Sequence, residues 1–479
     1  MAAARVIFIL ILCAFFTGCA SKVRPLADEA AKSRIPSLGS ESTSNEVVDT
    51  ASLWVVDFGD EELETLIRST LENNPDVAAA TARLRAATAT SRIIGADRLP
   101  QLSAQASGSR GRSVNQFPTA TGGEELISQT SSRYELGLRL SWEIDLWGKL
   151  ADARQAALFD QEATAAQLRE VRLALATATA RAWFRATALH LQQQLAAKQL
   201  EVSQKSLRAT EDRVNRGLLG SLELSLARSQ VESSASTLES RIREKRNALR
   251  QVQTLTGAFP DGNFTPSGNL PELTTAPPSL LPAQVLARRP DLIAASLEIS
   301  AADSRVNEAE KNLIPSISLT GSYGTASDDL SDLLDSDFTV WNLAGNLLQP
   351  LFQGGRLRAE VQRREALLTA AVADFESTLL TAFREVEDTL DSDSYLRTAS
   401  ARAQEAARLA QEAASLGFDR YERGLIELLD VLELQNRAFD LYNLAVDLRL
   451  AALLNRVDLY AALGGGFEPA EEPNLYDEP

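Results

Sequence analysis

The chain is poor in the side chains that most enzymes and metal sites need. Its 479 residues include one histidine, His190, two cysteines, Cys13 and Cys19, and one methionine, Met1. A zinc site usually has several His or Cys ligands, and a Ser-His-Asp or Cys-His triad needs a base beside its nucleophile. His190 lies in a helical run, where a surface or interhelical position is expected. We therefore predict neither an enzyme nor a metal or cofactor site.

Positive charge is also in short supply. Lys and Arg number 48 against 65 Asp and Glu, which gives a net charge of -17 and a pI near 4.8. Nucleic-acid binding usually needs a basic face, so this class of partner is disfavoured. Hydrophobic residues make up 44% of the chain, enough for a core. Many of them are alanines, which suit closely packed helices.

The N-terminal apolar run, Val6 to Phe16, is too short to cross a bilayer, since a spanning helix needs about 20 residues. It fits the apolar part of a signal peptide. Small residues before Cys19 resemble a lipobox. We expect a signal peptide over residues 1–18 and a fatty-acylated (palmitate-bearing) Cys19, followed by a polar tether over 19–52. The alternative is an ordinary signal peptide cut nearby. Cys13 would be removed in either case, so no disulfide is expected.

The chain repeats itself, because four landmarks recur in the same order. They are Asn74-Pro75-Asp76 with Arg289-Pro290-Asp291, Leu99-Pro100 with Ile314-Pro315, Trp147-Gly148-Lys149 with Gly354-Gly355-Arg356, and Asp212 to Leu218 with Asp419 to Leu425. Two repeats are predicted, over residues 53–257 and 281–463. A linker rich in Pro and Gly separates them at 258–280, and an acidic, disordered tail follows at 464–479.

Each repeat contains a predicted β-hairpin, at residues 101–147 and 316–351. From Arg133 to Leu146, apolar side chains alternate with polar or charged ones. A period of two in an exported protein fits barrel strands with lipid outside and water inside, and a half-buried soluble hairpin is the alternative. Four strands cannot close a membrane barrel, so the chain must form oligomers if they span. Two copies would supply eight strands and three copies twelve.

The rest of each repeat is predicted to be helical. A helix from Ala151 to Arg216 would be roughly 100 Å long. Two shorter helices, 60–98 and 221–255, would match it when stacked end to end, and 356–423, 282–313 and 426–463 repeat this pattern. A seven-residue spacing predicts a coiled-coil seam through Leu425, Leu432, Phe439, Val446, Leu453 and Tyr460. Alternating alanines from Ala174 to Ala182 would let one helix contact neighbours on both flanks.

These residues resemble the TolC family of outer-membrane efflux proteins, in its OprM-like and NodT-like lipoprotein branch. The lipobox, the duplicated Pro-Asp marks, Glu143 to Gly148 and Gln349 to Gly355 carry the resemblance. It implies a mixed α+β, mainly helical fold. Three chains would form a twelve-stranded outer-membrane barrel and a helical tube across the periplasm. A periplasmic adaptor and an inner-membrane pump, commonly of the RND class, would complete a system that expels drugs and other small toxic compounds.

The resemblance also places function at the helix turns. Adaptor docking is expected at Arg216, Gly217, Leu218, Arg423, Gly424 and Leu425. Asp430 and Glu433 resemble pore-constricting acidic residues, which would form cation-favouring rings in a trimer. Asp212, Arg213, Asp419 and Arg420 are expected to form ion pairs that hold the closed tip. Alternatives are a type I secretion duct, a heavy-metal exporter and, in another class, a periplasmic coiled-coil scaffold without a pore.

Overall fold

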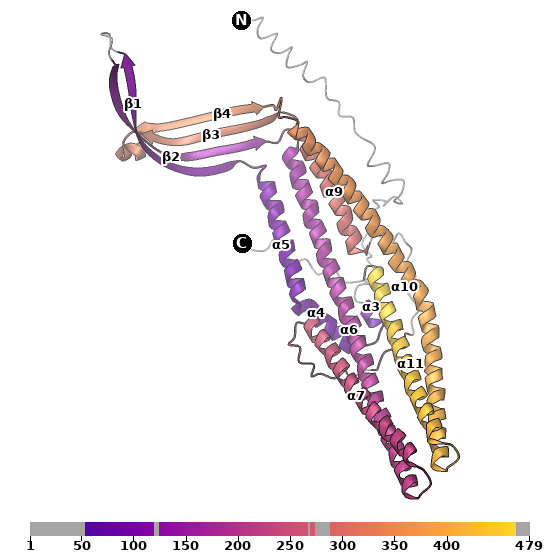
Figure 1. The fold of residues 1–479 in the computed structure, drawn as a ribbon. Helices are drawn as coiled ribbons and strands as arrows, with labels where there is room; N and C mark the ends of the chain where they lie inside the picture. Colours follow the sequence, from indigo (N-terminus) through magenta and orange to yellow (C-terminus); the bar gives the residue numbers. More distant parts are fainter. Residues whose placement is uncertain (1–52, 119–123, 267–268, 274–287, 466–479) are drawn as a thin grey trace. The chain divides into compact units, whose positions relative to one another are not determined.

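The computed structural model describes residues 53–118, 124–266, 269–273 and 288–465 (Figure 1). Contacts divide the chain into Met1–Val48 and Asp49–Pro479, and every described residue belongs to the second unit. The expected signal peptide, Cys19 and its tether lie outside the described residues, and so does residue 466 onward in the tail.

The described residues form helices and one antiparallel sheet. The helices are α3 (Leu53–Val56), α4 (Glu61–Asn73), α5 (Pro75–Ala96), α6 (Lys149–Asn215), α7 (Ser221–Leu255), α9 (Pro290–Lys311), α10 (Arg356–Glu422) and α11 (Leu428–Ala462), with short 3₁₀ helices at Leu330–Leu334 and Ser336–Phe338. The strands are β1 (Gln101–Pro118), β2 (Glu124–Ile144), β3 (Ser316–Ser327) and β4 (Thr339–Leu348), in the spatial order β1-β2-β3-β4.

The register of the sheet places apolar residues of both hairpins on one face. Leu138 of β2 lies opposite Ala104 of β1 and Tyr323 of β3, and Tyr323 lies opposite Trp341 of β4. Arg139, the next residue along β2, shares the other face with serine and asparagine side chains of its neighbours. The alternation expected in each hairpin is therefore continuous across four strands. β1 and β4 are the two edges of this sheet.

The strands differ in length from the predicted ones. The first hairpin extends beyond Ser109 and Arg133, so its two strands pair over 18 residues each. Its second strand ends at Ile144, whereas the alternation predicted a strand to Leu146. The strand ends there because the side chain of Asp145 caps the start of the next helix. Its carboxylate accepts hydrogen bonds from the backbone N–H groups of Leu150 (3.1 Å) and Ala151 (2.8 Å), at the start of α6.

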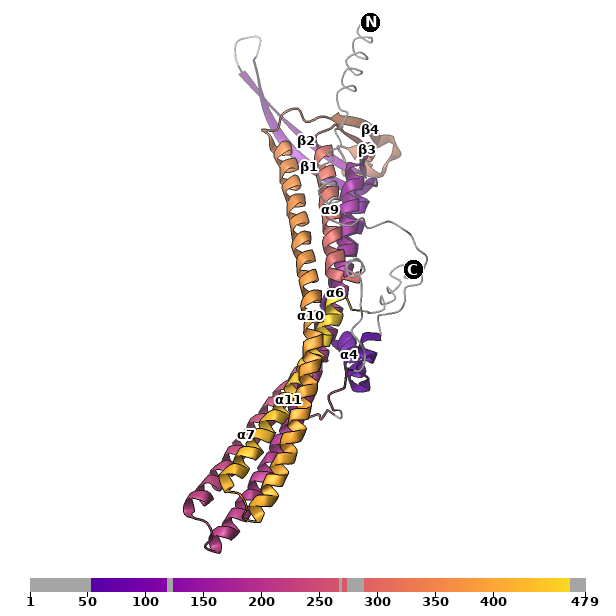
Figure 2. The same ribbon diagram turned by 90° about the vertical axis from the view of Figure 1, so that its right-hand side faces the viewer.

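The long helices pack as the stacking prediction requires. α6 contacts both α5 and α7, and α10 contacts both α9 and α11, while α6 also contacts α9 and α11 (Figures 1 and 2). The prediction of one helix over 60–98 is wrong, because α4 ends at Asn73 and α5 begins at Pro75. A proline disfavours helical geometry in the residue before it, and Asn74 is extended, with φ -72° and ψ 129°. Residues 282–287 of the second predicted short helix lie outside the described residues.

The duplicated Pro-Asp marks join the stacked helices. Asn74 donates from Nδ2 to the carbonyl oxygen of Leu255 at the end of α7 (2.9 Å) and accepts from the N–H of Asp76 at the start of α5 (2.8 Å). Arg289 donates from Nη1 to the carbonyl oxygen of Ala462 at the end of α11 (3.0 Å). Each side chain satisfies a carbonyl that would otherwise lack a partner at a helix end.

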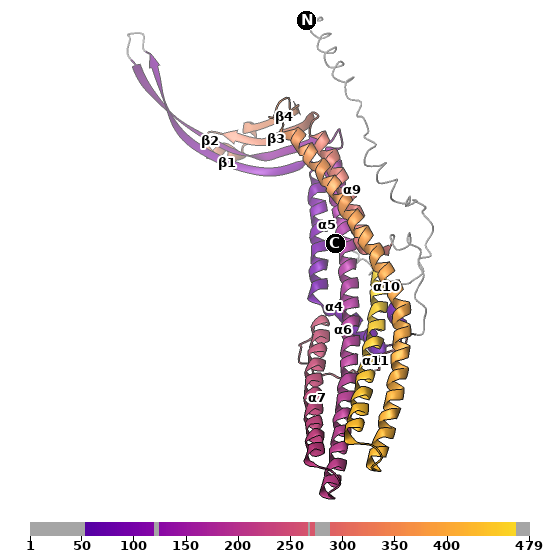
Figure 3. The same cartoon turned by 45° about the vertical axis from the view of Figure 1, so that its right-hand side comes forward.

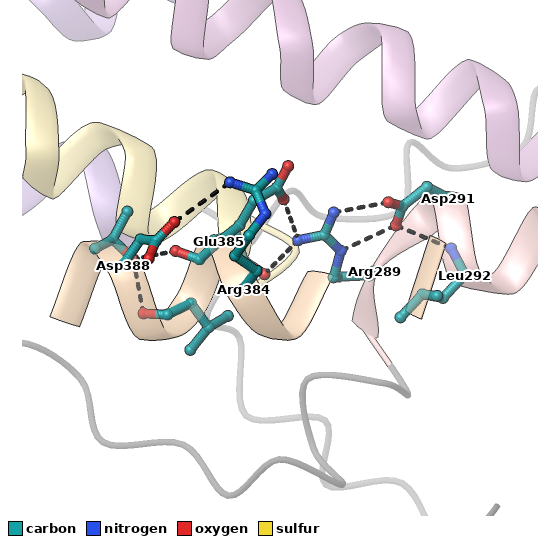
Figure 4. Close-up of polar contacts among 9 residues, drawn as sticks. Arg289, Asp291, Leu292, Arg384, Glu385 and Asp388 are labelled. Carbon is teal, nitrogen blue, oxygen red and sulfur yellow. Dashed lines mark hydrogen bonds and ion pairs between the residues drawn. The ribbon is translucent and has the colours of Figure 1, made fainter. Parts of the chain in front are cut away.

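Arg289 is held by two carboxylates (Figure 4). Its guanidinium pairs with Asp291 (2.7 Å) in α9 and with Glu385 (2.9 Å) in α10, and its side chain is 9% exposed. Arg384, one residue before Glu385, instead pairs with Asp388 on the exposed side of α10 (3.3 Å). The buried guanidinium therefore fastens α9, α10 and α11 together at one point.

The largest core cluster lies between α3, α4, α6 and α11. On α6, Ala176 and Ala180 face Trp54 and Leu453, while Ala182 packs on another flank against Leu249 of α7. The prediction that small residues let α6 contact neighbours on both flanks is confirmed. The predicted heptad seam is buried in α11 at Leu432, Val446, Leu453 and Tyr460 and half-buried at Phe439. Leu425 is exposed because it lies in the preceding turn.

The predicted linker between the repeats packs on the helices where it is described. Phe264 stacks on Trp183 of α6, with ring centroids 6.3 Å apart and planes at 4°. Leu270 is buried in the largest cluster, and Arg449 of α11 donates to the carbonyl oxygen of Pro271 (3.2 Å). This segment therefore contributes to the core as well as connecting the repeats.

Candidate functional site at the helix turns

The two turns predicted to dock a partner have the same backbone geometry. In the first, Gly217 has φ +75°, and the N–H of Leu218 donates to the carbonyl oxygen of Arg213 (2.9 Å). In the second, Gly424 has φ +78°, and the N–H of Leu425 donates to the carbonyl oxygen of Arg420 (2.9 Å). This pattern is a Schellman motif, which needs a left-handed residue at the position of each glycine.

The turns present their apolar residues to solvent in the single chain. Leu218 is 64% exposed and Leu425 is 68% exposed, and Arg423 is also exposed. Arg216 forms an ion pair with Asp212 one helical turn earlier. The two turns lie at the same end of the helices, away from the strands (Figures 1 and 3). Such exposed leucines on tight turns are available to a partner.

The helix that follows each turn begins in the same way. Glu223 accepts through Oε2 from the N–H of Gly220 at the start of α7 (3.0 Å). Asp430 accepts through Oδ2 from the N–H of Glu427 at the start of α11 (3.3 Å). Asp430 therefore occupies in repeat two the position of Glu223 in repeat one, where a carboxylate also favours the positive end of the helix dipole.

Asp430 and Glu433 are both exposed; Asp430 lies in the first turn of α11 and Glu433 follows about one helical turn later. Glu433 lines a groove of about 750 Å³ between α7 and α11, whose walls also include Leu226, Leu429 and Asp440. Across this groove, Gln230 donates to Asn436 (2.9 Å). Both acidic side chains are therefore open to solvent near the end of the helices in the single chain.

The two turns are connected through Tyr421, whose side chain is fully buried. Its hydroxyl lies 2.9 Å from Oγ1 of Thr210 on α6. The guanidinium of Arg213 lies 4.7 Å from the centre of the Tyr421 ring and donates to the Tyr421 carbonyl oxygen (3.1 Å). These contacts join the end of α6 to the end of α10, since one ring is held from its face and from its hydroxyl.

The four residues predicted to form gate ion pairs are placed differently within one chain. Asp212 pairs with Arg216, and Arg213 lies on Tyr421. In the described part of the chain, no ion pair joins Asp212 or Arg213 to Asp419 or Arg420. Pairs between these residues of different chains stay a prediction.

The sequence comparison missed Tyr421 and Thr210, although it contained a clue. The matched turn segments are identical at five of seven positions, and Tyr421 stands where the first repeat has Val214. The side chain that joins the repeats in the structure is thus one of the two positions at which the repeated motif differs. His190, the only histidine, faces Lys245 of α7, and burial, aided by that lysine, lowers its pKa.

A second polar cavity, of about 470 Å³, lies beside Arg289 between α6, α9, α10 and α11. Burial raises the pKa of Glu170 on its wall, and the nearby Asp291 carboxylate adds to the shift. Arg181 forms an ion pair with Asp458 across this cavity. Both arginines that line the cavity are paired with carboxylates on other helices or on the helix that follows, Arg181 with Asp458 and Arg289 with Asp291 and Glu385, which indicates a structural role in joining helices.

Comparison with known proteins decides between a channel and a scaffold. Residues 66–258 and 281–465 match the outer membrane efflux protein family. The chain belongs to this family. It is 30% identical over 416 residues to the cation efflux system protein CusC of Escherichia coli K12, with 86% of this chain and 88% of CusC covered. It is 31% identical over 424 residues to the outer membrane protein OprJ of Pseudomonas aeruginosa, covering 88% and 87% of the two chains.

Solved structures of outer-membrane channels have the same fold. The OprN channel superposes with a TM-score of 0.80 at 26% identity, covering 88% of this chain and 94% of OprN. VceC of Vibrio cholerae superposes with a TM-score of 0.78 at 27% identity, covering 88% and 100%. This member of the outer membrane efflux protein family is therefore an outer-membrane channel for efflux and not an enzyme, and the scaffold alternative is wrong.

Proposed function

We propose that the chain forms the outer-membrane component of a tripartite efflux system that conducts small toxic compounds or drugs out of the cell. A periplasmic adaptor and an inner-membrane pump of the RND class would deliver the compounds. The observation that carries this proposal is the four-stranded sheet, which has one apolar face, one polar face and two open edges. In the wall of a membrane pore, the apolar face of such a sheet contacts lipid and the polar face contacts water.

The open edges favour assembly of several copies. Unpaired strand edges within a bilayer cost several kcal/mol for each unsatisfied backbone group, so the sheet needs neighbours that continue it. Helix α10 supports the same conclusion, because it contains an 18-residue window with a mean hydropathy of 1.3, of which 11% is buried in one chain. Leu367, Leu380 and Leu390 are exposed along α10 and would pack against adjacent copies. Three copies, as the resemblance implies, would give a twelve-stranded barrel.

The docking of the adaptor is proposed at Arg216, Gly217, Leu218, Arg423, Gly424 and Leu425. Exposed leucines on two turns of the same backbone geometry support it, because a helical partner recognises apolar anchors of this kind. The contact of Arg213 with Tyr421 would hold the turns in the geometry that the adaptor meets.

The lipid anchor is proposed at Cys19, on the resemblance of residues 16–19 to a lipobox. One relative, SilC of Salmonella typhimurium, is named a probable outer membrane lipoprotein, at 29% identity over 421 residues. The mass of the mature N-terminal peptide tests the proposal. An acylated Cys19 is expected, and an unmodified peptide that begins elsewhere would contradict it.

Small organic compounds are proposed as the cargo rather than metal ions. Relatives are named for cations (CusC), pyoverdine (OpmQ) and solvents (SrpC), so kinship alone does not select a cargo. Over the described ranges, no group of three or more His, Cys, Asp or Glu is arranged to hold a metal ion. Mature soft-metal ligands are also scarce, since Met1 and Cys13 precede the expected cleavage site.

The acidic residues at the start of α11 provide the test of pore function. Three copies would bring six carboxylates of Asp430 and Glu433 together, and such rings favour cations. We expect Asp430→Asn with Glu433→Gln to weaken the cation selectivity of the purified protein in planar lipid bilayers. The asparagine retains an oxygen that can accept from the N–H of Glu427, so the start of the helix is preserved.

The control is Glu223→Gln, which removes the carboxylate that in repeat one occupies the position of Asp430. Its cation selectivity is expected to stay close to that of the wild type. Identical selectivity in all three proteins would refute the assignment of Asp430 and Glu433 to the pore.

A further inference from the structure

The apolar face of the sheet has a sharp outer boundary. On β2 the face consists of Tyr134, Leu136, Leu138, Leu140, Trp142 and Ile144. From Tyr134 to Ile144 the strand advances about 33 Å, which at a tilt near 40° corresponds to about 25 Å of height, the usual thickness of the apolar band of a barrel. Ile144 leads towards α6 and the periplasm, so Tyr134 marks the outer edge.

Beyond that edge the same face becomes polar and positively charged. The first hairpin continues past Gly108 and Tyr134 without a break in register, whereas β3 ends at Ser327 (Figure 3). By alternation, Arg110 and Arg112 share the face of Leu102 and Ala106, and their partners on β2 are Ser132 and Thr130. Two guanidinium groups therefore follow the apolar band at once on the lipid-facing side.

Both arginines are available to an anionic ligand. Arg110 and Arg112 are exposed, and among the described residues neither forms an ion pair. Arg133 at the same level belongs to the opposite, water-facing side of the sheet and pairs with Glu135. Beyond the apolar band, the outward side of the hairpin therefore carries two guanidinium groups without an ion-pair partner among the described residues.

We propose that Arg110 and Arg112 bind the phosphate groups of the phosphorylated glycolipid that forms the outer leaflet of the outer membrane. The site continues a lipid-facing surface, and its charge complements phosphates that lie just above the acyl chains. A guanidinium binds phosphate through two parallel hydrogen bonds, which makes arginine well suited to this headgroup. The inference rests on the outer-membrane orientation of the sheet and not on the proposed cargo.

The experiment measures lipid binding to the full-length protein in detergent by native mass spectrometry. The probes are bis-phosphorylated lipid A, lipid A stripped of both phosphates, and phosphatidylglycerol. We expect the wild type to bind the bis-phosphorylated form at least about tenfold more tightly than either other lipid. R110Q/R112Q should lose this preference. R133Q/R139Q, which removes the same charge from the water-facing side, should retain it.

Three results would overturn the inference. They are the absence of a preference in the wild type, a preference kept by R110Q/R112Q, and equal binding of phosphatidylglycerol, which would indicate a general response to anionic lipid. Bilayer conductance of the same preparations separates this inference from pore function. If the wild type conducts but shows no lipid preference, only the glycolipid site is contradicted. If the wild type does not conduct, the proposed pore is contradicted.

Discussion

Replacing Gly217 and Gly424 together with phenylalanine is expected to abolish export while leaving assembly of the channel intact. A Cβ atom at Gly217 would meet nothing within 4 Å, and one at Gly424 would be 3.9 Å from Arg213. The added rings would therefore point away from the chain's own helices and into the space that the adaptor needs. Export is measured as the drug susceptibility of cells whose own channel of this kind has been deleted.

The control for this experiment is the double alanine variant. Both glycines have positive φ, so any L-residue there pays about 1–2 kcal/mol for left-handed geometry. Alanine and phenylalanine share this cost and differ in bulk alone. We expect the alanine variant to export and the phenylalanine variant to leave cells as susceptible as those without the channel. Equal export by the two variants would contradict the proposal that the turns belong to the docking surface.

Arg289→Met is expected to destabilise the junction between α11 and α9 by about 3–5 kcal/mol, because breaking a buried ion pair leaves its partners uncompensated. Asp291 and Glu385 would lose their cation, and the Ala462 carbonyl would lose its donor. Hydrogen exchange of the Ile293 and Leu463 amides, which lie on either side of the junction, should accelerate about 100-fold or more.

Arg384→Met is the matched control for the junction. Arg384 also pairs with a carboxylate of α10, Asp388 (Figure 4), but both side chains are about two-thirds exposed. Exposed pairs contribute about 0–1 kcal/mol, so exchange should change by no more than about fivefold. Comparable acceleration in the two variants would mean that Arg289 does not join the helices.

Much of the architecture could be predicted because its signals are local and repeated. Alternation of side chains along β2 and β3 defines strands with one apolar face, whatever lies beside them. The absence of proline within the two longest helices, together with paired glycines at their ends, defined helices of the observed length. The strand and helix ends were less accurate, because Asp145 and Asn74 bond to groups outside their own segments.

The contacts between the repeats could not be predicted in the same way. Nothing in the Arg-Pro-Asp motif indicates that Arg289 reaches Ala462, since the two residues are brought together by the packing of α9 on α10 and α11. Tyr421 likewise gains its role from Thr210, which lies 211 positions earlier in the chain. Such partners depend on which faces of the helices pack together, and the sequence pattern of a single helix does not determine this.

The sequence by itself determined the element types, the two-fold repetition and the polarity of each hairpin. The tertiary structure decided the register that merges the two hairpins into one apolar face, and the extension that places Arg110 beyond it. It also assigned Asp430 a hydrogen bond at the start of α11. The physical reason is that periodicity follows from backbone geometry alone, whereas register and side-chain partners follow from the burial and hydrogen bonding of distant segments together.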